Sequence, residues 1–213
     1  MGLLNTRRMY MGHHKPYDAE VEYLEVNTSN VNERAWIDTG YVPNANTKIY
    51  TKFVCYDGYA DYCGLIGMRF NNKNEGRILV VCPSSLTTAN RTGSMGSLSY
   101  GPNTYNDKII HTLEYNLKDK FAKLDDTSYS LKNAVILFTN EPTLSLFRNN
   151  GYPADELGFA ANGRIYYIKI VENDVVLDMI PVVKNGIGYM YDKVSEKLFG
   201  NDGPGNFIIG PDI

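Results

Sequence analysis

The stretch that decides the fold reads Asn162-Gly163-Arg164-Ile165-Tyr166-Tyr167-Ile168-Lys169-Ile170. Aromatic and β-branched residues dominate it, a composition typical of β-strands. Similar runs follow at residues 175–183, 188–193 and 198–201, and Asn, Asp and Gly turn signals separate them. Strand-like runs divided in this way predict consecutive antiparallel strands. These runs contain no His, no Cys and no convergent carboxylate cluster, so they indicate an architecture but no chemistry.

Strand signals also fill the chain upstream of this stretch. They lie at residues 21–26, 35–40, 48–56, 62–68, 77–82, 108–115, 120–125 and 133–138. Within 108–115, alternate residues from Ile109 to Tyr115 share one face, as expected of a half-buried strand. No segment shows a helical period over more than two turns. The pattern therefore predicts an all-β fold, an antiparallel β-sandwich of the jelly-roll type.

Residues 84–102 are predicted to form a long loop, because they are rich in Ser, Thr and Gly and poor in apolar anchors. Long ordered loops are where sandwiches commonly carry their binding sites. The chain also holds 17 Tyr against eight Phe and one Trp. Tyrosine combines an apolar ring with a polar edge, so it suits both half-buried strand faces and binding surfaces.

The organisation predicted for the 213 residues is an N-terminal arm, residues 1–18, followed by one jelly-roll domain, residues 19–213. The arm is basic, with no acidic residue before Asp18. It develops no apolar period, so we expect it not to pack on its own core. Two interpretations stay open: the arm docks on an acidic partner surface, or it is a solvated tail.

Charge, hydropathy and cysteine usage argue against several classes of protein. A net charge of −3 disfavours nucleic-acid binding, which needs a basic footprint. No apolar run reaches the roughly 20 residues of a membrane span, and the N-terminus lacks the apolar core of a secretory signal. Cys55, Cys63 and Cys82 are odd in number and suit a reducing compartment. We interpret them as core residues, with a Cys55–Cys63 contact across a hairpin at Asp57-Gly58 as the alternative.

Residues able to carry catalysis by a nucleophile or a base are few. His13, His14 and His111 are the only histidines. The first two lie on the arm, and His111 lies in a strand beside apolar residues, which predicts a packed structural role. No Ser-His-Asp or Cys-His arrangement is indicated. We therefore expect that the protein is not an enzyme.

One group of carboxylates, Glu20, Glu22 and Glu25, is spaced like the acidic strand of some jelly-roll glycosidases. Retaining hydrolysis needs two carboxyl groups about 5–5.5 Å apart, which Glu20 and Glu22 could supply. Glu25 reaches their face only through a bulge. We interpret the three as a solvated, charged strand edge that discourages aggregation. The glycoside hydrolase alternative predicts turnover that Glu20→Gln or Glu22→Gln abolishes.

Metal binding has little support from the sequence. Asp57 with Asp61, and Asp125 with Asp126, could offer oxygen ligands to calcium in loops. Turn formation explains both pairs more simply. We expect no metal site and no cofactor.

Two groups of motifs resemble those of a known family. The first comprises Glu22-Tyr23-Leu24-Glu25, Trp36-Ile37-Asp38-Thr39-Gly40-Tyr41-Val42-Pro43 and Thr47-Lys48-Ile49. The second and more specific group comprises residues 162–170, 178–182, 188–194 and 197–199 and the tail Gly203-Pro204-Gly205-Asn206-Phe207. Over residues 20–211 the chain resembles the concanavalin A-like (laminin G-like) jelly rolls. These occur in phage and prophage proteins and in gut bacterial surface proteins.

The first loop departs from that family. Residues 27–35 stand where its members usually carry Ser-x-Gly-Thr-Gln, so this loop is specific to the chain. The resemblance implies a noncatalytic, often virion-attached module that binds glycans or proteins. It transfers no catalytic residue.

We therefore hypothesise a virion structural protein of a tailed bacteriophage: a head fibre, a capsid decoration or a tail-associated adhesin. It would be made in the host cytoplasm and located in the virion, as a homo-oligomer, a dimer or trimer. No nucleic-acid or membrane partner is expected. The arm residues expected to dock on other virion proteins are Arg7, Arg8, Met9, Tyr10, Lys15 and Tyr17.

The alternative is a bacterial cell-surface or secreted carbohydrate-binding module. In either case the jelly roll could contact a host surface glycan through aromatic side chains. The candidate contacts are Trp36, Tyr59, Tyr62 and Tyr100. A glycan array discriminates the two classes, because strong binding to one polysaccharide favours the lectin-like module.

Overall fold

The fold is seen in a computed structural model, which describes residues 15–58, 64–72, 75–82, 85–90, 98–100, 108–130, 143–150 and 161–213. Within these residues the protein is all-β, as predicted, and its strands form two large, mainly antiparallel sheets. The helical structure of this part is the short 3₁₀ helix η1 (Val31–Glu33). None of the described residues belongs to a helix that could cross a membrane.

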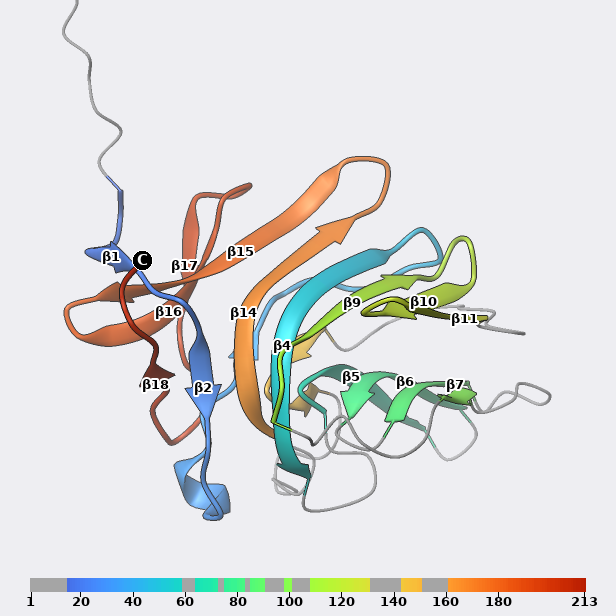
Figure 1. Ribbon diagram of the computed structural model, residues 1–213, viewed down its shortest axis with the longest axis horizontal. Helices are drawn as coiled ribbons and strands as arrows, with labels where there is room; N and C mark the ends of the chain where they lie inside the picture. The colour runs from blue at the N-terminus through green and yellow to red at the C-terminus, as the bar shows by residue number, and fades with distance from the viewer. Residues whose placement is uncertain are drawn as a thin grey trace, which may run out of the picture.

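The larger sheet contains eight strands in one continuous path and three more at its side. In spatial order the path is β11 (Thr127–Ser130), β10 (Phe121–Leu124), β9 (His111–Asn116), β4 (Lys48–Gly58), β14 (Ala161–Val171), β15 (Val175–Lys184), β16 (Ile187–Asp192) and β17 (Lys197–Phe199). Beside it, β2 (Leu24–Val26) pairs with β14 and with β18 (Ile208–Ile209), and β1 (Ala19–Glu20) pairs with β15. Figure 1 shows β14, β4 and β9 as curved strands that lie side by side.

The smaller sheet is built from the middle of the chain. Its spatial order is β3 (Ile37–Asp38), β12 (Ser145–Leu146), β5 (Ile66–Asn72), β6 (Glu75–Cys82), β7 (Ser85–Asn90) and β8 (Leu98–Tyr100). One parallel pairing occurs here, between β13 (Asn149–Asn150) and β5. In Figure 1, β5, β6 and β7 lie beneath β9, β10 and β11.

One hydrophobic cluster contains side chains from both sheets. From the larger sheet it includes Phe53 and Ile165, and from the smaller sheet Ile66 and Leu146. Gly163 of β14 lies against the Val54 carbonyl, and a β-carbon there would come 3.0 Å from the Leu65 side chain. The two sheets therefore share one apolar core.

The C-terminal strands confirm the prediction made from residues 162–201. β14, β15, β16 and β17 follow one another and pair antiparallel. β15 and β16 are joined by Asn185 and Gly186, whose φ angles of 52° and 73° are those of a two-residue hairpin turn. An Asn-Gly pair adopts this left-handed conformation at low cost, which explains the strength of the signal.

The face predicted for residues 108–115 is confirmed from His111 onward, whereas Ile109, which was expected on the same face, is 56% exposed and precedes β9. His111, Leu113 and Tyr115 of β9 are buried, and Thr112 between them is exposed. Cys55 is fully buried in the core, as its interpretation as a core residue predicted. β4 continues through Gly58, so no hairpin turns at Asp57-Gly58. Cys63 lies outside the described residues.

The long loop predicted at residues 84–102 was wrong. β7 and β8 occupy 85–90 and 98–100, and β7 pairs with β6 from Cys82↔Ser85 to Arg77↔Asn90. Ladder hydrogen bonds to a neighbouring strand hold an extended backbone even where Ser and Thr give a weak side-chain signal. Residues 91–97 and the predicted strand at 133–138 lie outside the described residues.

The first predicted strand, residues 21–26, is shortened to β2 (Leu24–Val26), and β1 (Ala19–Glu20) precedes it. β1 pairs with β15, and β2 pairs with β14 and β18. The solvated edge expected for the three carboxylates was wrong for Glu25, which is only 5% exposed. Glu25 is buried because β2 lies between two neighbouring strands and its carboxylate binds Arg164.

Candidate functional site

The predicted binding residues are only partly described. Arg7, Arg8, Met9, Tyr10, Tyr59 and Tyr62 lie outside the described residues. Tyr100 lies in β8, where its backbone pairs with Leu86 of β7. Lys15, Tyr17 and Trp36 are described, and each contacts other parts of the same chain.

Lys15 and Tyr17 lie against the β domain. The Lys15 ammonium is 2.7 Å from the Glu20 carboxylate, to which the Tyr17 hydroxyl also donates a hydrogen bond of 2.8 Å. The Tyr17 ring is 9% exposed, with its centroid 4.9 Å from that of Tyr191 in β16. Burial is the largest of the effects that raise the pKa of Tyr17, followed by the bond to Glu20. The end of the predicted arm is thus fixed on its own domain.

Trp36 directly precedes β3. It is half buried, and the Arg148 guanidinium lies 4.6 Å from its ring centroid. Burial lowers the pKa of Arg148, and contact with an aromatic face partly compensates a cation for lost water. The Trp36 backbone N–H donates to the Asn201 side chain at 3.1 Å.

Asn201 lies near the start of a C-terminal strap, residues 200–213, that runs antiparallel along residues 20–38. Near its start, the Asp202 N–H donates to the Trp36 carbonyl at 2.9 Å. Its middle contains β18, which pairs with β2. At its end, the Ile213 N–H donates to the Glu20 carbonyl at 3.1 Å. The two ends of the domain therefore lie together, as Figure 1 shows for β1 and the C-terminus.

Two glycines allow the strap to approach so closely. Gly203 lies against the Arg34 carbonyl, and a β-carbon there would also come 2.6 Å from the Trp36 ring. Gly205 lies against the Glu33 carbonyl and donates its N–H to the Arg34 carbonyl at 3.2 Å. Any side chain at these positions would push the strap away from η1. The Gly-Pro-Gly tail motif is thus explained by backbone contact.

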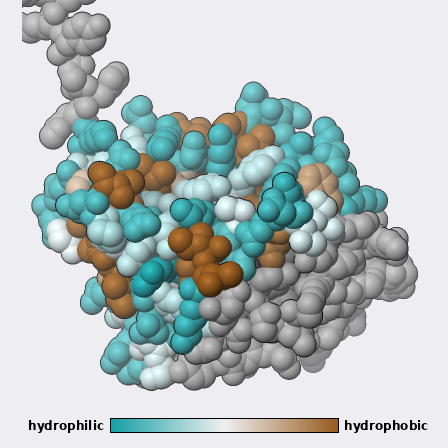
Figure 2. All heavy atoms as spheres, viewed as in Figure 1, coloured by the Kyte–Doolittle hydropathy of each residue, from teal (hydrophilic) through white to brown (hydrophobic). Residues whose placement is uncertain are grey.

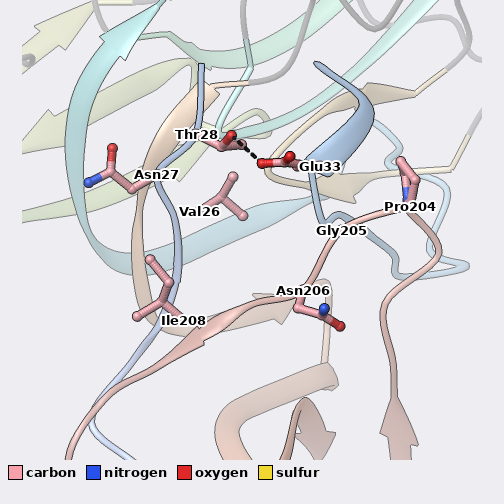
Figure 3. A pocket seen from close by; sticks show the side chains of 8 residues that line it. All are labelled: Val26, Asn27, Thr28, Glu33, Pro204, Gly205, Asn206 and Ile208. Atoms are coloured by element: carbon pink, nitrogen blue, oxygen red, sulfur yellow. Dashed lines mark hydrogen bonds between the residues drawn. The ribbon is translucent and has the colours of Figure 1, made fainter. Parts of the chain in front are cut away.

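A pocket of about 320 Å³ opens where this strap passes the end of β2 and η1. Its lining residues are Val26, Asn27, Thr28, Glu33, Pro204, Gly205, Asn206 and Ile208. Figure 3 shows Val26 in the centre of this group, with Thr28 and Glu33 above it and Asn206 and Ile208 below it in the view. Reciprocal 3.2 Å bonds between the Asn162 side chain and the Thr28 backbone fix the wall formed by β2 to β14.

Local capping bonds orient the Glu33 carboxylate in this pocket. Asn30 is the N-cap of η1, and its side-chain oxygen accepts the Asn32 N–H at 3.0 Å. The Asn30 amide in turn donates to Glu33 Oε1 at 2.9 Å, and Thr28 Oγ1 lies 3.5 Å from Oε2. A carboxylate offers about four acceptor sites, so capacity remains for a ligand.

The chemistry of the pocket is that of a polar binding site. Glu33 is its one charged side chain, and no cation lines it among the described residues. Asn27 and Asn206 are exposed and add amide groups that both donate and accept hydrogen bonds. Val26, Pro204 and Ile208 supply apolar contact area. Such a lining can hold a small, uncharged, hydroxyl-rich molecule.

A second polar cluster lies on the face of the larger sheet opposite the core. The Arg164 Nε donates to Glu25 at 2.6 Å, and its guanidinium lies 4.3 Å from the Tyr23 ring centroid. Burial alone would lower the pKa of Arg164, but the bond to Glu25 raises it above the ordinary value. Burial also raises the pKa of the nearby Tyr56 to about 12. Because its charged members are paired with each other, this cluster acts mainly as a cross-strand stabiliser.

His111 is the one histidine in the described part of the chain. His111 is 5% exposed, and its Nδ1 lies 2.7 Å from the Asp125 carboxylate at the end of β10. This pair faces the Phe53 ring in the core, which fits the packed structural role predicted for the histidine. Within the described part of the chain, no three His, Cys, Asp or Glu side chains gather in a way that could hold a metal ion.

Sequence reasoning missed Glu33 and Asn206 as members of a site. The capping signal Asn30-x-x-Glu33 and the Gly203-Pro204-Gly205 motif were both visible in the sequence. Neither signal indicated that these two segments lie side by side in the fold. Figure 2 shows that the face seen in Figure 1 is largely hydrophilic over its coloured part, with separate hydrophobic patches.

Comparison with known proteins leaves the chain without an assigned family: no family model matches it, and no curated protein matches it. The all-β fold, the anchored start of the domain and the pocket beside the strap are the findings from which a function can be proposed.

Proposed function

We propose that this chain is a noncatalytic attachment module of a tailed-phage particle. In this proposal, residues 19–213 form a concanavalin A-like jelly roll displayed on the virion. The N-terminal arm, residues 1–18, docks on another virion protein through residues 1–14, and the displayed domain contacts a host glycan or protein. The motifs at residues 162–170 and 203–207, which resemble those of such jelly rolls, support the family part of the proposal.

The sandwich part is supported by the shared core. Two antiparallel sheets contribute side chains to one cluster, and β14 approaches Leu65 of the other layer through Gly163. Face-to-face packing of two sheets over one core is what defines a β-sandwich.

The observation that carries the attachment role is the fixed start of the domain. Asp18 donates its N–H to the Val183 carbonyl at 2.8 Å and accepts the Asn185 N–H at 2.6 Å. Together with the Tyr17–Tyr191 contact, these bonds fix the residues that follow the arm to β15 and β16. A domain held in this way would be presented in a defined orientation by whatever surface binds residues 1–14.

Deletion of residues 1–14 in the phage genome tests this proposal. We expect the shortened protein to fold normally, because its described bonds start at Lys15, and to be absent from purified particles by immunoblot. A charge-matched control, Lys123→Ala with Lys197→Ala, alters two exposed lysines of the domain and should leave incorporation unchanged. Normal incorporation of the shortened protein would contradict the docking role of the arm. Light scattering tests the proposed dimer or trimer, which a strict monomer would exclude.

A second candidate, a bacterial cell-surface carbohydrate-binding module, is favoured by the pocket alone. Its polar lining and its size suit a small ligand. Particle incorporation separates the two candidates, because a cell-surface module has no reason to enter virions.

A further inference from the structure

We propose that the pocket between η1 and the C-terminal strap binds a single uncharged sugar ring, and that Glu33 is its specificity-determining residue. The inference rests on the proposed function, because attachment to a glycan requires a place where a sugar unit is recognised. It adds the site and the chemical class of the ligand.

The size of the pocket limits the ligand first. A volume of about 320 Å³ lies at the lower end of the range for small-molecule sites, roughly 300–1,000 Å³. One hexose ring fits this space, whereas an extended oligosaccharide can place only one unit in it. The remaining units of a longer glycan would lie outside, over the exposed side chains of Asn27 and Asn206.

The lining favours a polyhydroxylated ring. A sugar hydroxyl can donate to the Glu33 carboxylate, and amides such as Asn206 can both donate to and accept from further hydroxyls. The C–H face of the ring is apolar and suits the surfaces of Val26, Pro204 and Ile208. Carboxylates that accept from hydroxyls form the stronger, charge-assisted hydrogen bonds.

The negative charge of Glu33 disfavours acidic sugars. Glu33 is the one ionised group among the eight lining residues, and Arg or Lys is not among them. An acidic sugar would therefore meet repulsion without a compensating cation. A primary amine is the competing ligand class, because it too would bind a carboxylate. The three apolar and two amide side chains suit a sugar ring better than a compact, strongly hydrated ammonium.

One wall of the pocket is formed by this chain's own loop, and the strap forms the other. Glu33 and Thr28 lie in residues 27–35, the segment where the sequence departs from the family that it resembles. The Asn30 cap and its bond to Glu33 hold the carboxylate in place before a ligand arrives. A preorganised group loses little conformational freedom on binding.

Saturation-transfer difference NMR on the full chain, with calorimetry for affinity, tests the proposal. The neutral sugars are the methyl glycosides of glucose, galactose, mannose and N-acetylglucosamine. Glucuronic acid and Nα-acetyl-lysine serve as the acidic and amine comparators. We expect a neutral glycoside to bind and its Kd to rise about tenfold in Glu33→Gln and in Asn206→Ala. Glu196→Gln, which removes an exposed carboxylate in the β16–β17 turn, should leave the Kd unchanged.

Three results would overturn the inference. They are no binding of any neutral glycoside at about 10 mM, equal affinity in wild type and Glu33→Gln, and preferential binding of the acid or the amine. Thermal unfolding of each variant shows whether it is folded. If Glu33→Gln does not fold, Asn206→Ala provides the second test. Sugar binding by a protein that never enters particles would refute the phage role and leave the pocket intact. Incorporation into particles without any sugar binding would refute the sugar site and leave the phage role intact.

Discussion

The backbone carbonyl of Glu33 packs directly against the α-carbon of Gly205, on the side where any other residue carries its β-carbon. The adjoining Gly205 N–H donates to the Arg34 carbonyl at 3.2 Å. Gly205 therefore sets the distance between the strap and η1, and with it the width of the pocket beside them. Two backbones in such contact have no flexible side chain that could move aside.

Gly205→Ala should lower the free energy of unfolding by about 2 kcal/mol or more, because the strap must separate from η1 to accept the methyl group. Urea denaturation measures the loss. Gly200→Ala is the matched control within the strap: its β-carbon would come 3.1 Å from the side chain of Tyr189, which is only half buried and can shift. Equal stability of the two variants would show that the close approach at Gly205 costs nothing.

The pairing of Glu25 with Arg164 gives a second prediction. Glu25 retains 7% of its side-chain exposure, and Arg164 retains 34%. Arg164→Met leaves an almost buried carboxylate without its cation, and we expect a loss of about 2 kcal/mol in urea denaturation. This is less than the 3–5 kcal/mol of a fully buried pair, because water still reaches the arginine.

Two controls separate this effect from a general loss of charge. Lys48→Met breaks the more exposed pair with Asp119, whose atoms lie 3.7 Å apart, and should cost less than about 1 kcal/mol. The double variant Glu25→Leu/Arg164→Met also removes the unpaired carboxylate, so it should regain most of the stability that Arg164→Met loses. If the double variant is no more stable than Arg164→Met, burial of the unpaired charge is not the cause.

The sequence predicted those parts of the fold whose signals are local. Residues 162–199 contain aromatic and β-branched runs between strong turns, so their strands could be predicted from the local sequence alone. Residues 85–90 carry no aromatic or apolar β-branched run, and their strand exists because β6 offers a ladder of backbone partners. That partner cannot be read from the segment itself, since strand pairing is a tertiary effect.

The candidate site could be predicted even less. Glu33 and Asn206 belong to opposite ends of the chain, and only the folded strap brings them to one pocket. Each segment carried a local signal, a helix cap and a Gly-Pro-Gly turn, but neither signal indicates its partner. Tyr17 shows the same limit: its segment has no apolar period, yet one aromatic contact with Tyr191 anchors it.

That anchor gives a third prediction. Tyr17→Ala should speed hydrogen exchange at the amides of residues 18–21 by about tenfold or more, because removing a buried ring costs roughly 1.5–3 kcal/mol. The Asp18 and Val21 amides donate to β15 and report this opening directly. Tyr17→Phe keeps the ring and removes only the hydroxyl bond to Glu20, so its exchange should stay close to that of the wild type. Equal rates in Tyr17→Ala and Tyr17→Phe would show that the ring contact with Tyr191 does not hold the segment.

Acid sensitivity gives the last prediction, and Asp192 carries it. Its carboxylate is 1% exposed and accepts hydrogen bonds from the Asp178, Val194 and Ser195 N–H groups and the Ser195 hydroxyl. Burial alone would raise the pKa of Asp192, but these donors lower it below its ordinary value.

A carboxyl group whose pKa is lower in the folded state stabilises the fold above its unfolded pKa, about 3.9, and loses that contribution as pH falls through the folded value. We therefore expect the free energy of unfolding to fall steeply below about pH 4 in the wild type. Asp192→Asn should cost about 2 kcal/mol at pH 7, since the amide nitrogen that replaces Oδ2 cannot accept from the two Ser195 donors. The same variant should flatten the acid limb of the stability curve measured by urea denaturation. Asp126→Asn, at an exposed turn residue, provides the comparison and should leave that limb unchanged. An acid limb equally steep in Asp192→Asn and the wild type would assign the acid sensitivity to other carboxylates.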